Sequence, residues 1–292
     1  MNAHTKNAHT KILSRNIIHK TKGRAHGPII RLMSPGDLGE RLKPFVFLDL
    51  VYADASFAGS MPLHPHSGIA TVTVFTDGEM HFDDVDSGQG YIGYGGVEWM
   101  RAGGGVWHGK EMSAGRSKTI TGFQLWLALP PELENGEVDS QYIESKDMPV
   151  SGPAHVILGS YEGVQSPVRA PKGINYLLVT LQAGEKWTYL PPEGHDTAWL
   201  SVSRGALQGI ETGVMAVFAP GPGPIDLQAS DEGEVNFVIA SAVPHPYDLV
   251  TGYYSVHTTP EALQKGEAKI EDLRALLTVD PNSQGTVPVF KG

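Results

Sequence analysis

Short apolar runs separated by glycine- and proline-rich turns are the feature that most constrains the fold of this chain. Residues 69–75 form a β-branched and aromatic run that stops at the turn signal of residues 76–79. Residues 44–51 are apolar except for Asp49, which predicts a buried strand with one carboxylate in need of a partner. The 35 glycines and 21 prolines exceed average usage and divide the chain into pieces of strand length. This pattern predicts an all-β fold of barrels or sandwiches.

Two histidines precede the run 69–75 with the spacing of one strand face. His64 and His66 are two residues apart, so a strand through them turns both imidazoles to the same side. His108 follows the glycine-rich turn 102–105, from which a later strand could return beside the first, and Glu111 comes shortly after it. Imidazoles with a carboxylate and open positions suit Fe(II) or another divalent transition metal better than a closed structural zinc site. The alternative is that these histidines are ordinary strand and turn residues.

These motifs resemble those of the pirin family in the cupin superfamily. The resemblance includes residues 64–68 and 71–73, Asp-Gly-Glu at 77–79, the run 97–105 and Gly-Phe-Gln-Leu-Trp at 122–126. Residues 44–48 and 159–168 are also similar to pirin segments, so the resemblance covers nearly all of the chain beyond the N-terminal tail. It implies a bicupin, with two cupin-type, jelly-roll-like β-barrels in tandem.

Two departures from the pirin pattern concern the site. Pirins usually have His-x-Glu at the second motif, whereas this chain has one more residue between His108 and Glu111. A regular strand would turn Glu111 away from the metal, but a bulge at Gly109 would bring it back and leave Lys110 outside. The family also usually has Glu where Ala70 stands, and in related flavonol-cleaving cupins a carboxylate in that motif is the expected general base. We assign no catalytic residue. The predicted metal ligands are His64, His66, His108 and Glu111.

A change in composition predicts the boundary between two units. Pro130-Pro131 ends an apolar run, an acidic loop follows, and residues 149–153 connect it to the second half. We predict an N-terminal tail and first strand over residues 1–25, a metal-binding barrel over 26–149, and a degenerate barrel with short C-terminal helices over 150–292. The tail contains the pentapeptide Asn-Ala-His-Thr-Lys twice, at 2–6 and 7–11, and its histidines receive no role. Thr259-Pro260-Glu261 is typical of a helix start.

The second half resembles a degenerate copy of the first. Aligning the turn glycines Gly78 and Gly205 places Pro191, Glu193 and Ile225 opposite the three histidines. None of these residues is an imidazole ligand. The alignment therefore predicts one metal site, located in the N-terminal barrel.

Composition narrows the classes of partner. A formal net charge of -10 and a pI near 5.6 oppose direct binding of nucleic acid. The sequence has no long apolar span, which predicts that it does not interact with a membrane. The absence of cysteine excludes disulfides and thiolate ligands, and a cytoplasmic protein is expected.

The resemblance implies two functions of different kinds. One is a quercetin 2,3-dioxygenase-like reaction of O₂ with a flavonol-like or other enolisable substrate, with Fe(II) as the first choice of metal and Ni, Cu, Mn or Zn in its place. The other is a metal-dependent regulator that docks on a protein partner without turnover. A cupin sugar isomerase is a third hypothesis, but nothing in the sequence marks a sugar or phosphate site. An open cavity beside His64 would favour the enzyme, and a filled one the regulator.

Overall fold

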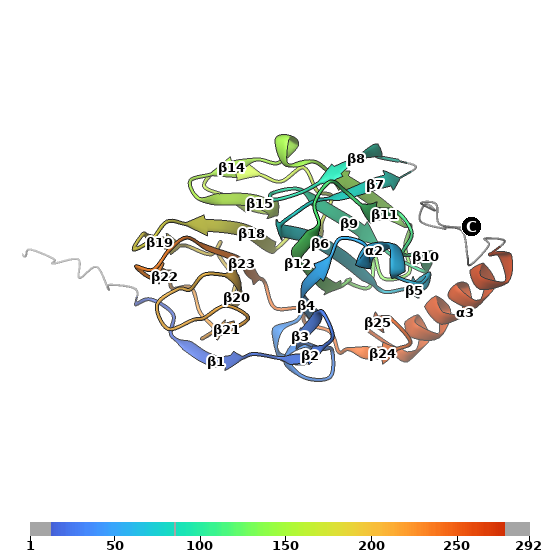
Figure 1. Cartoon of the computed structure of the whole chain (residues 1–292). Helices are drawn as coiled ribbons and strands as arrows, with labels where there is room; N and C mark the ends of the chain where they lie inside the picture. The colour runs from blue at the N-terminus through green and yellow to red at the C-terminus, as the bar shows by residue number, and fades with distance from the viewer. Residues whose placement is uncertain (1–12, 85, 278–292) are drawn as a thin grey trace, which may run out of the picture.

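The computed structural model describes residues 13–84 and 86–277, and the pentapeptide repeat with His4 and His9 lies outside this range. Two seven-stranded antiparallel sheets dominate it, which confirms the predicted all-β fold of two cupin-type barrels (Figure 1). The first sheet has the order β13 (Asp139–Ile143), β9 (Val97–Arg101), β6 (Ile69–Asp77), β12 (Thr119–Ala128), β4 (Phe45–Asp54), β3 (Ile29–Met33) and β2 (Arg24–His26). The second has the order β1 (Ile17–Thr21), β21 (Met215–Phe218), β20 (Thr197–Arg204), β23 (Val235–Ala242), β18 (Ile174–Leu181), β15 (Ala154–Leu158) and β14 (Val150–Ser151).

Smaller sheets complete the two barrels. The pair β5 (His64–His66) and β10 (Val106–His108) belongs to the first half, as does the sheet of β7 (Met80–Asp84), β8 (Gly88–Ile92) and β11 (Met112–Ala114). The second half contains β16 (Ser160–Tyr161), β17 (Val164–Gln165), β19 (Lys186–Tyr189), β22 (Ile225–Gln228), β24 (Val250–Gly252) and β25 (Ser255–His257). The helices are α1 (Leu38–Leu42), α2 (Phe57–Ser60), η1 (Ser145–Asp147) and α3 (Pro260–Leu276). No helix formed by the described residues has the length and apolarity needed to span a bilayer.

The main core lies between the two large sheets. Val72 and Val74 of β6 share one apolar cluster with Trp199 of β20, whose ring meets that of Phe45 edge-on at 5.5 Å. Because side chains alternate along a strand, the other face of β6 points away from this core, into the first barrel. Asp49 of β4 lies on that inner side and is 6% exposed; it accepts hydrogen bonds from the Arg31 guanidinium, which confirms its expected need for a partner.

Strand β1 and helix α3 each contact elements that are distant in the sequence. Strand β1 pairs with β21 at the edge of the second sheet, where it occupies the position that β13 has in the first (Figure 1). Helix α3, predicted to belong to the C-terminal barrel, contacts β10 of the first barrel, and Trp107 Nε1 donates to the Ile270 carbonyl at 3.0 Å. The helix start is confirmed, because the Thr259 hydroxyl accepts from Ala262 N at 3.1 Å. The division at residues 25 and 149 stays a prediction.

The two sheets have corresponding strands, but the register of the predicted repeat differs. Gly78 and Gly205 both follow the matching strands β6 and β20 with positive φ, at 75° and 72°. Strands β19 and β22 pair in the second barrel as β5 and β10 do in the first. The connection from β19 to β20, residues 190–196, is longer than that from β5 to β6, which shifts the alignment. The side chains of β19 and β22 that pack into the second barrel are Trp187, Tyr189, Ile225 and Leu227, and none of them is an imidazole.

Candidate metal centre

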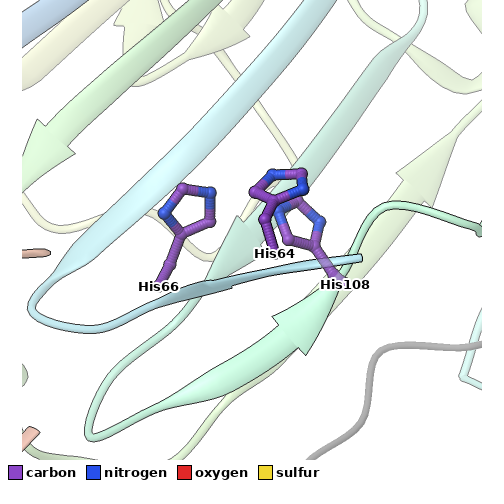
Figure 2. Close-up of side chains that lie close together, drawn as sticks. All are labelled: His64, His66 and His108. Atoms are coloured by element: carbon purple, nitrogen blue, oxygen red, sulfur yellow. The ribbon is translucent and has the colours of Figure 1, made fainter. Parts of the chain in front are cut away.

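Two short antiparallel strands bring the three histidines together. In the pair β5 and β10, His64 lies opposite His108 and His66 lies opposite Val106. One ring nitrogen from each histidine lies within 4.8 Å of the others, and Figure 2 shows the three rings on the same side of the two strands. Within residues 13–84 and 86–277, these side chains form the group whose geometry could hold a metal ion.

Each histidine is oriented by an oxygen at its Nδ1 atom. His64 Nδ1 lies 2.9 Å from the Pro62 carbonyl, His66 Nδ1 lies 2.9 Å from the Tyr254 carbonyl, and His108 Nδ1 lies 3.0 Å from Glu111 Oε1. These oxygens can only accept, so we assign the Nδ1 proton to all three rings. Nε2 is then the nitrogen left to bind a metal, as in metal-binding histidines whose other nitrogen donates to a carbonyl or carboxylate.

The side chains fit a metal ion. His108 Nε2 is buried and has no hydrogen-bond partner among the described residues. An unpaired buried nitrogen costs free energy, which a ligand bound at that nitrogen would recover. The donor set of three imidazoles suits Zn, Cu, Fe or Ni.

The environment keeps two of the histidines neutral. Burial, with a smaller contribution from His108, lowers the pKa of His64 to about 4. The pKa of His66 lies well below its usual value, again mainly because of burial. A metal binds the unprotonated imidazole, so both rings are ready to bind near neutral pH.

Glu111 faces the centre, and Lys110 does not. Strand β10 ends at His108, and Gly109 follows with φ of 122°, a conformation that favours glycine. The Glu111 carboxylate accepts from Gly109 N at 2.6 Å and from His108, whereas Lys110 Nζ donates outward to the Gly59 carbonyl. Burial lowers the pKa of His108, but the charge and hydrogen bond of Glu111 outweigh it and raise that pKa. Glu111 thus orients a histidine, and its role as a direct ligand stays a prediction.

A cavity of about 270 Å³ lies in front of the histidines. Its wall includes Trp126, which stacks on Phe47 with ring centroids 4.0 Å apart and meets the His66 ring edge-on. The Arg31 guanidinium lies over the Phe47 ring, and Tyr254 lines the cavity while its side chain is partly exposed. The cavity therefore has flat aromatic walls and reaches solvent.

One functional candidate was not predicted. Glu98 of β9 lines the cavity, is 2% exposed and interrupts the apolar run of residues 97–100. A carboxylate inside a buried strand was the available signal. By contrast, Ala70, where pirins usually have Glu, lies in the core between the sheets and faces away from the cavity. The expected acid at that position would not reach this site.

The C-terminal hairpin is held against the first barrel by a buried polar network. The Ser67 hydroxyl lies 2.9 Å from His257 Nε2 and donates to Ser255. His257 Nδ1 lies 3.3 Å from Glu134 Oε2, and Glu134 accepts from both the backbone and the hydroxyl of Thr258. This network fixes β25 and, with it, the Tyr254 carbonyl that orients His66.

The fold and site define a bicupin with a candidate histidine metal centre in one barrel. The Pirin family model matches residues 29–127. A pirin-like protein of Caulobacter vibrioides is 36% identical over 177 residues, which cover 56% of this chain and 62% of that protein, less than two thirds of its length. A protein of Vibrio cholerae named putative quercetin 2,3-dioxygenase is 32% identical over 194 residues, covering 61% of this chain and 68% of that one.

The chain belongs to the pirin family. A crystal structure of quercetin 2,3-dioxygenase from Acinetobacter baumannii has a TM-score of 0.75 at 24% identity, covering 90% of this chain and 98% of that one. At that identity the likeness concerns the fold alone.

Proposed function

We propose that this pirin is a metal-dependent oxygenase that cleaves flavonol-like substrates, as a quercetin 2,3-dioxygenase does. The observation that carries the proposal is the convergence of three histidines whose Nδ1 atoms are all engaged, beside a cavity open to solvent. Three protein ligands with room for further ones are typical of catalytic rather than structural sites. The open cavity favours turnover over a purely regulatory docking role.

His64, His66 and His108 would hold one divalent metal per chain through Nε2. Fe(II) is our first choice, with Ni, Cu, Mn or Zn as alternatives. When bound, the metal supplies a Lewis acid for an enol oxygen and a centre for O₂ chemistry. Glu111 keeps the His108 ring oriented, and its carboxylate is our candidate for a fourth ligand.

The cavity favours a flat aromatic substrate. Phe47 lies between Trp126 and the Arg31 guanidinium, so Trp126 is the ring of this stack that can offer a face to a substrate. Offset stacking of rings contributes about 0.5–1.5 kcal/mol per pair. The Vibrio cholerae relative is named putative quercetin 2,3-dioxygenase, and a flavonol is a flat aromatic molecule of this kind.

The test combines metal analysis with an oxygen-uptake assay. Protein without a His tag would be analysed for bound metal, reloaded with Fe(II) under argon, and mixed with quercetin and O₂. We expect one metal per chain and oxygen uptake that depends on quercetin. The double variant His64→Ala/His108→Ala keeps the tail histidines but should lose both the bound metal and the uptake. Equal uptake by the double variant would contradict the proposal.

A further inference from the structure

Glu98 is a buried carboxyl group without a cationic partner among the described residues. It lines the same cavity as the three histidines but makes no hydrogen bond to any of them. Its oxygens are instead held by hydroxyls: Thr73 Oγ1 contacts Oε2, and Thr71 Oγ1 lies 3.4 Å from Oε1. A buried carboxylate is usually paired with a cation or a metal, so this arrangement is unusual for a purely structural residue.

The Thr73 hydroxyl can form a hydrogen bond with Glu98 whether Glu98 is ionised or protonated. It lies within hydrogen-bond distance of Glu98 Oε2 and also 2.9 Å from Gln124 Oε1, and its single proton can be donated to only one of them at a time. When Glu98 is ionised, Thr73 donates to it. When Glu98 is protonated, Glu98 donates to Thr73, and Thr73 donates to Gln124. The site therefore accommodates a proton on Glu98 without leaving that proton unpaired.

Both states are accessible near neutral pH in the metal-free protein. Burial raises the pKa of Glu98 to about 7, although the hydrogen bond from Thr73 and the charge of His108 act against this rise. An acid or base is most effective when its pKa lies near the working pH.

We propose that Glu98 is the base that ionises the substrate at this centre, a role that rests on the proposed function. The substrate class is a planar aromatic enol, such as a flavonol with a free 3-hydroxyl. In the step, the substrate O–H bond breaks, an O–H bond forms on Glu98, and the substrate becomes an enolate; no electron is transferred. Glu98 lies on β9, whereas position 70, where pirins usually have an acid, lies on β6 and faces away from this cavity.

Anaerobic binding of 3-hydroxyflavone tests this role, because its single hydroxyl is the enol. The metal-loaded protein would be titrated under argon at a pH where the free probe is neutral. Absorption spectra distinguish the neutral probe from its anion, and calorimetry in two buffers of different ionisation enthalpy counts the protons released. We expect the wild type to bind the anion without releasing a full proton. Glu98→Gln should either bind the neutral probe or release one proton to the buffer.

Further variants separate a chemical role from a structural one. Glu98→Gln is nearly isosteric, and its metal content and circular dichroism should match those of the wild type. Its quercetin-dependent oxygen uptake should fall ~10²-fold or more, the usual contribution of general base catalysis. Glu98→Asp should restore part of the anion binding and part of the oxygen uptake. Glu79→Gln, which changes a partly buried partner of Arg116 outside the cavity, should leave both unchanged.

Two outcomes would overturn the inference in distinguishable ways. If Glu98→Gln binds the anion with the same proton release as the wild type, Glu98 is not the base, although the proposed function stands. If the metal-loaded wild type binds neither 3-hydroxyflavone nor quercetin, the flavonol function fails, and the role of Glu98 fails with it.

Discussion

The three histidines differ in how far along the chain their orienting partners lie. His64 depends on Pro62 and His108 on Glu111, both within three residues. His66 depends on the Tyr254 carbonyl, 188 residues away. Two of the rings are thus set by local sequence and the third by tertiary structure.

Glu111→Gln should weaken metal binding. The variant removes the carboxylate that fixes the His108 ring, and loss of such a partner typically lowers metal affinity ~10-fold or more. Competition with a chromogenic chelator measures the change. Lys110→Gln is the matched control in the same turn, because Lys110 points away from the centre. Unchanged affinity in Glu111→Gln would mean that the histidines hold the metal without its help.

Glu98→Gln should change how stability depends on pH. The folded protein raises the pKa of Glu98 from 4.5 to about 7, so between these values the folded state binds more protons than the unfolded state. The free energy of unfolding of the wild type therefore falls as pH rises through this window. Glutamine does not titrate, so the variant does not show this fall. Relative to the wild type, the metal-free variant should gain on the order of 3 kcal/mol between pH 5 and pH 8.

Urea unfolding of both proteins at the two pH values measures this gain. The exposed Glu232→Gln serves as the control and should follow the wild type. An equal stability difference between Glu98→Gln and the wild type at pH 5 and pH 8 would contradict the predicted pKa shift.

At the scale of elements, the hairpin of β24 and β25 supports the centre through Glu134. Glu134→Ala would leave the buried backbone N–H and hydroxyl of Thr258 without acceptors. Unsatisfied buried donors cost about 1–3 kcal/mol each, so we expect a loss of roughly 3 kcal/mol in the free energy of unfolding. Because the hairpin also carries the acceptor for His66, metal affinity should fall as well.

Chemical denaturation and chelator competition measure the two effects of Glu134→Ala. The exposed Glu132→Ala, two residues earlier, is the control. A destabilised variant with wild-type metal affinity would show that the hairpin does not orient His66.

The local parts of the centre could be predicted from the sequence, and the distant parts could not. Strand alternation brought His64 and His66 to one face, and a glycine turn returned His108 beside them. Gly109 indicated that Glu111 would face inward. Tyr254 gave no such signal, because its contribution is a backbone carbonyl, which every residue has. Glu98 was visible as a charge in an apolar strand, but its neighbours Thr71 and Thr73 became apparent only from the pairing of β6 with β9.

At the scale of the whole molecule, the two barrels share one core, so they should unfold together. Trp199→Ala, in the second barrel, removes a fully buried ring from the cluster between the sheets. Such a truncation typically costs about 3–5 kcal/mol. We expect metal release and loss of β-sheet circular dichroism to shift together to lower denaturant concentration. Separate transitions for metal release and for the second barrel would contradict this prediction.

The two-barrel fold could be predicted from turn spacing and family motifs. The pairing of β1 with β21 and the contact of α3 with β10 could not. Strand β1 is mostly exposed and pairs through backbone hydrogen bonds. Every residue except proline can form such bonds, so the sequence of β1 does not indicate which sheet it joins. The helical spacing of α3 predicted an apolar face without indicating which barrel it covers. The register of the second barrel was missed because a longer connection separates β19 from β20.

The position of Tyr254 also has a consequence for the order of events during protein synthesis. The three histidines leave the ribosome in the first half of the chain, but the carbonyl that orients His66 follows 188 residues later. The nascent first barrel therefore carries an incomplete centre until Tyr254 has also been synthesised. A metal ion that reached the three histidines before that point would meet a His66 ring without its orienting acceptor.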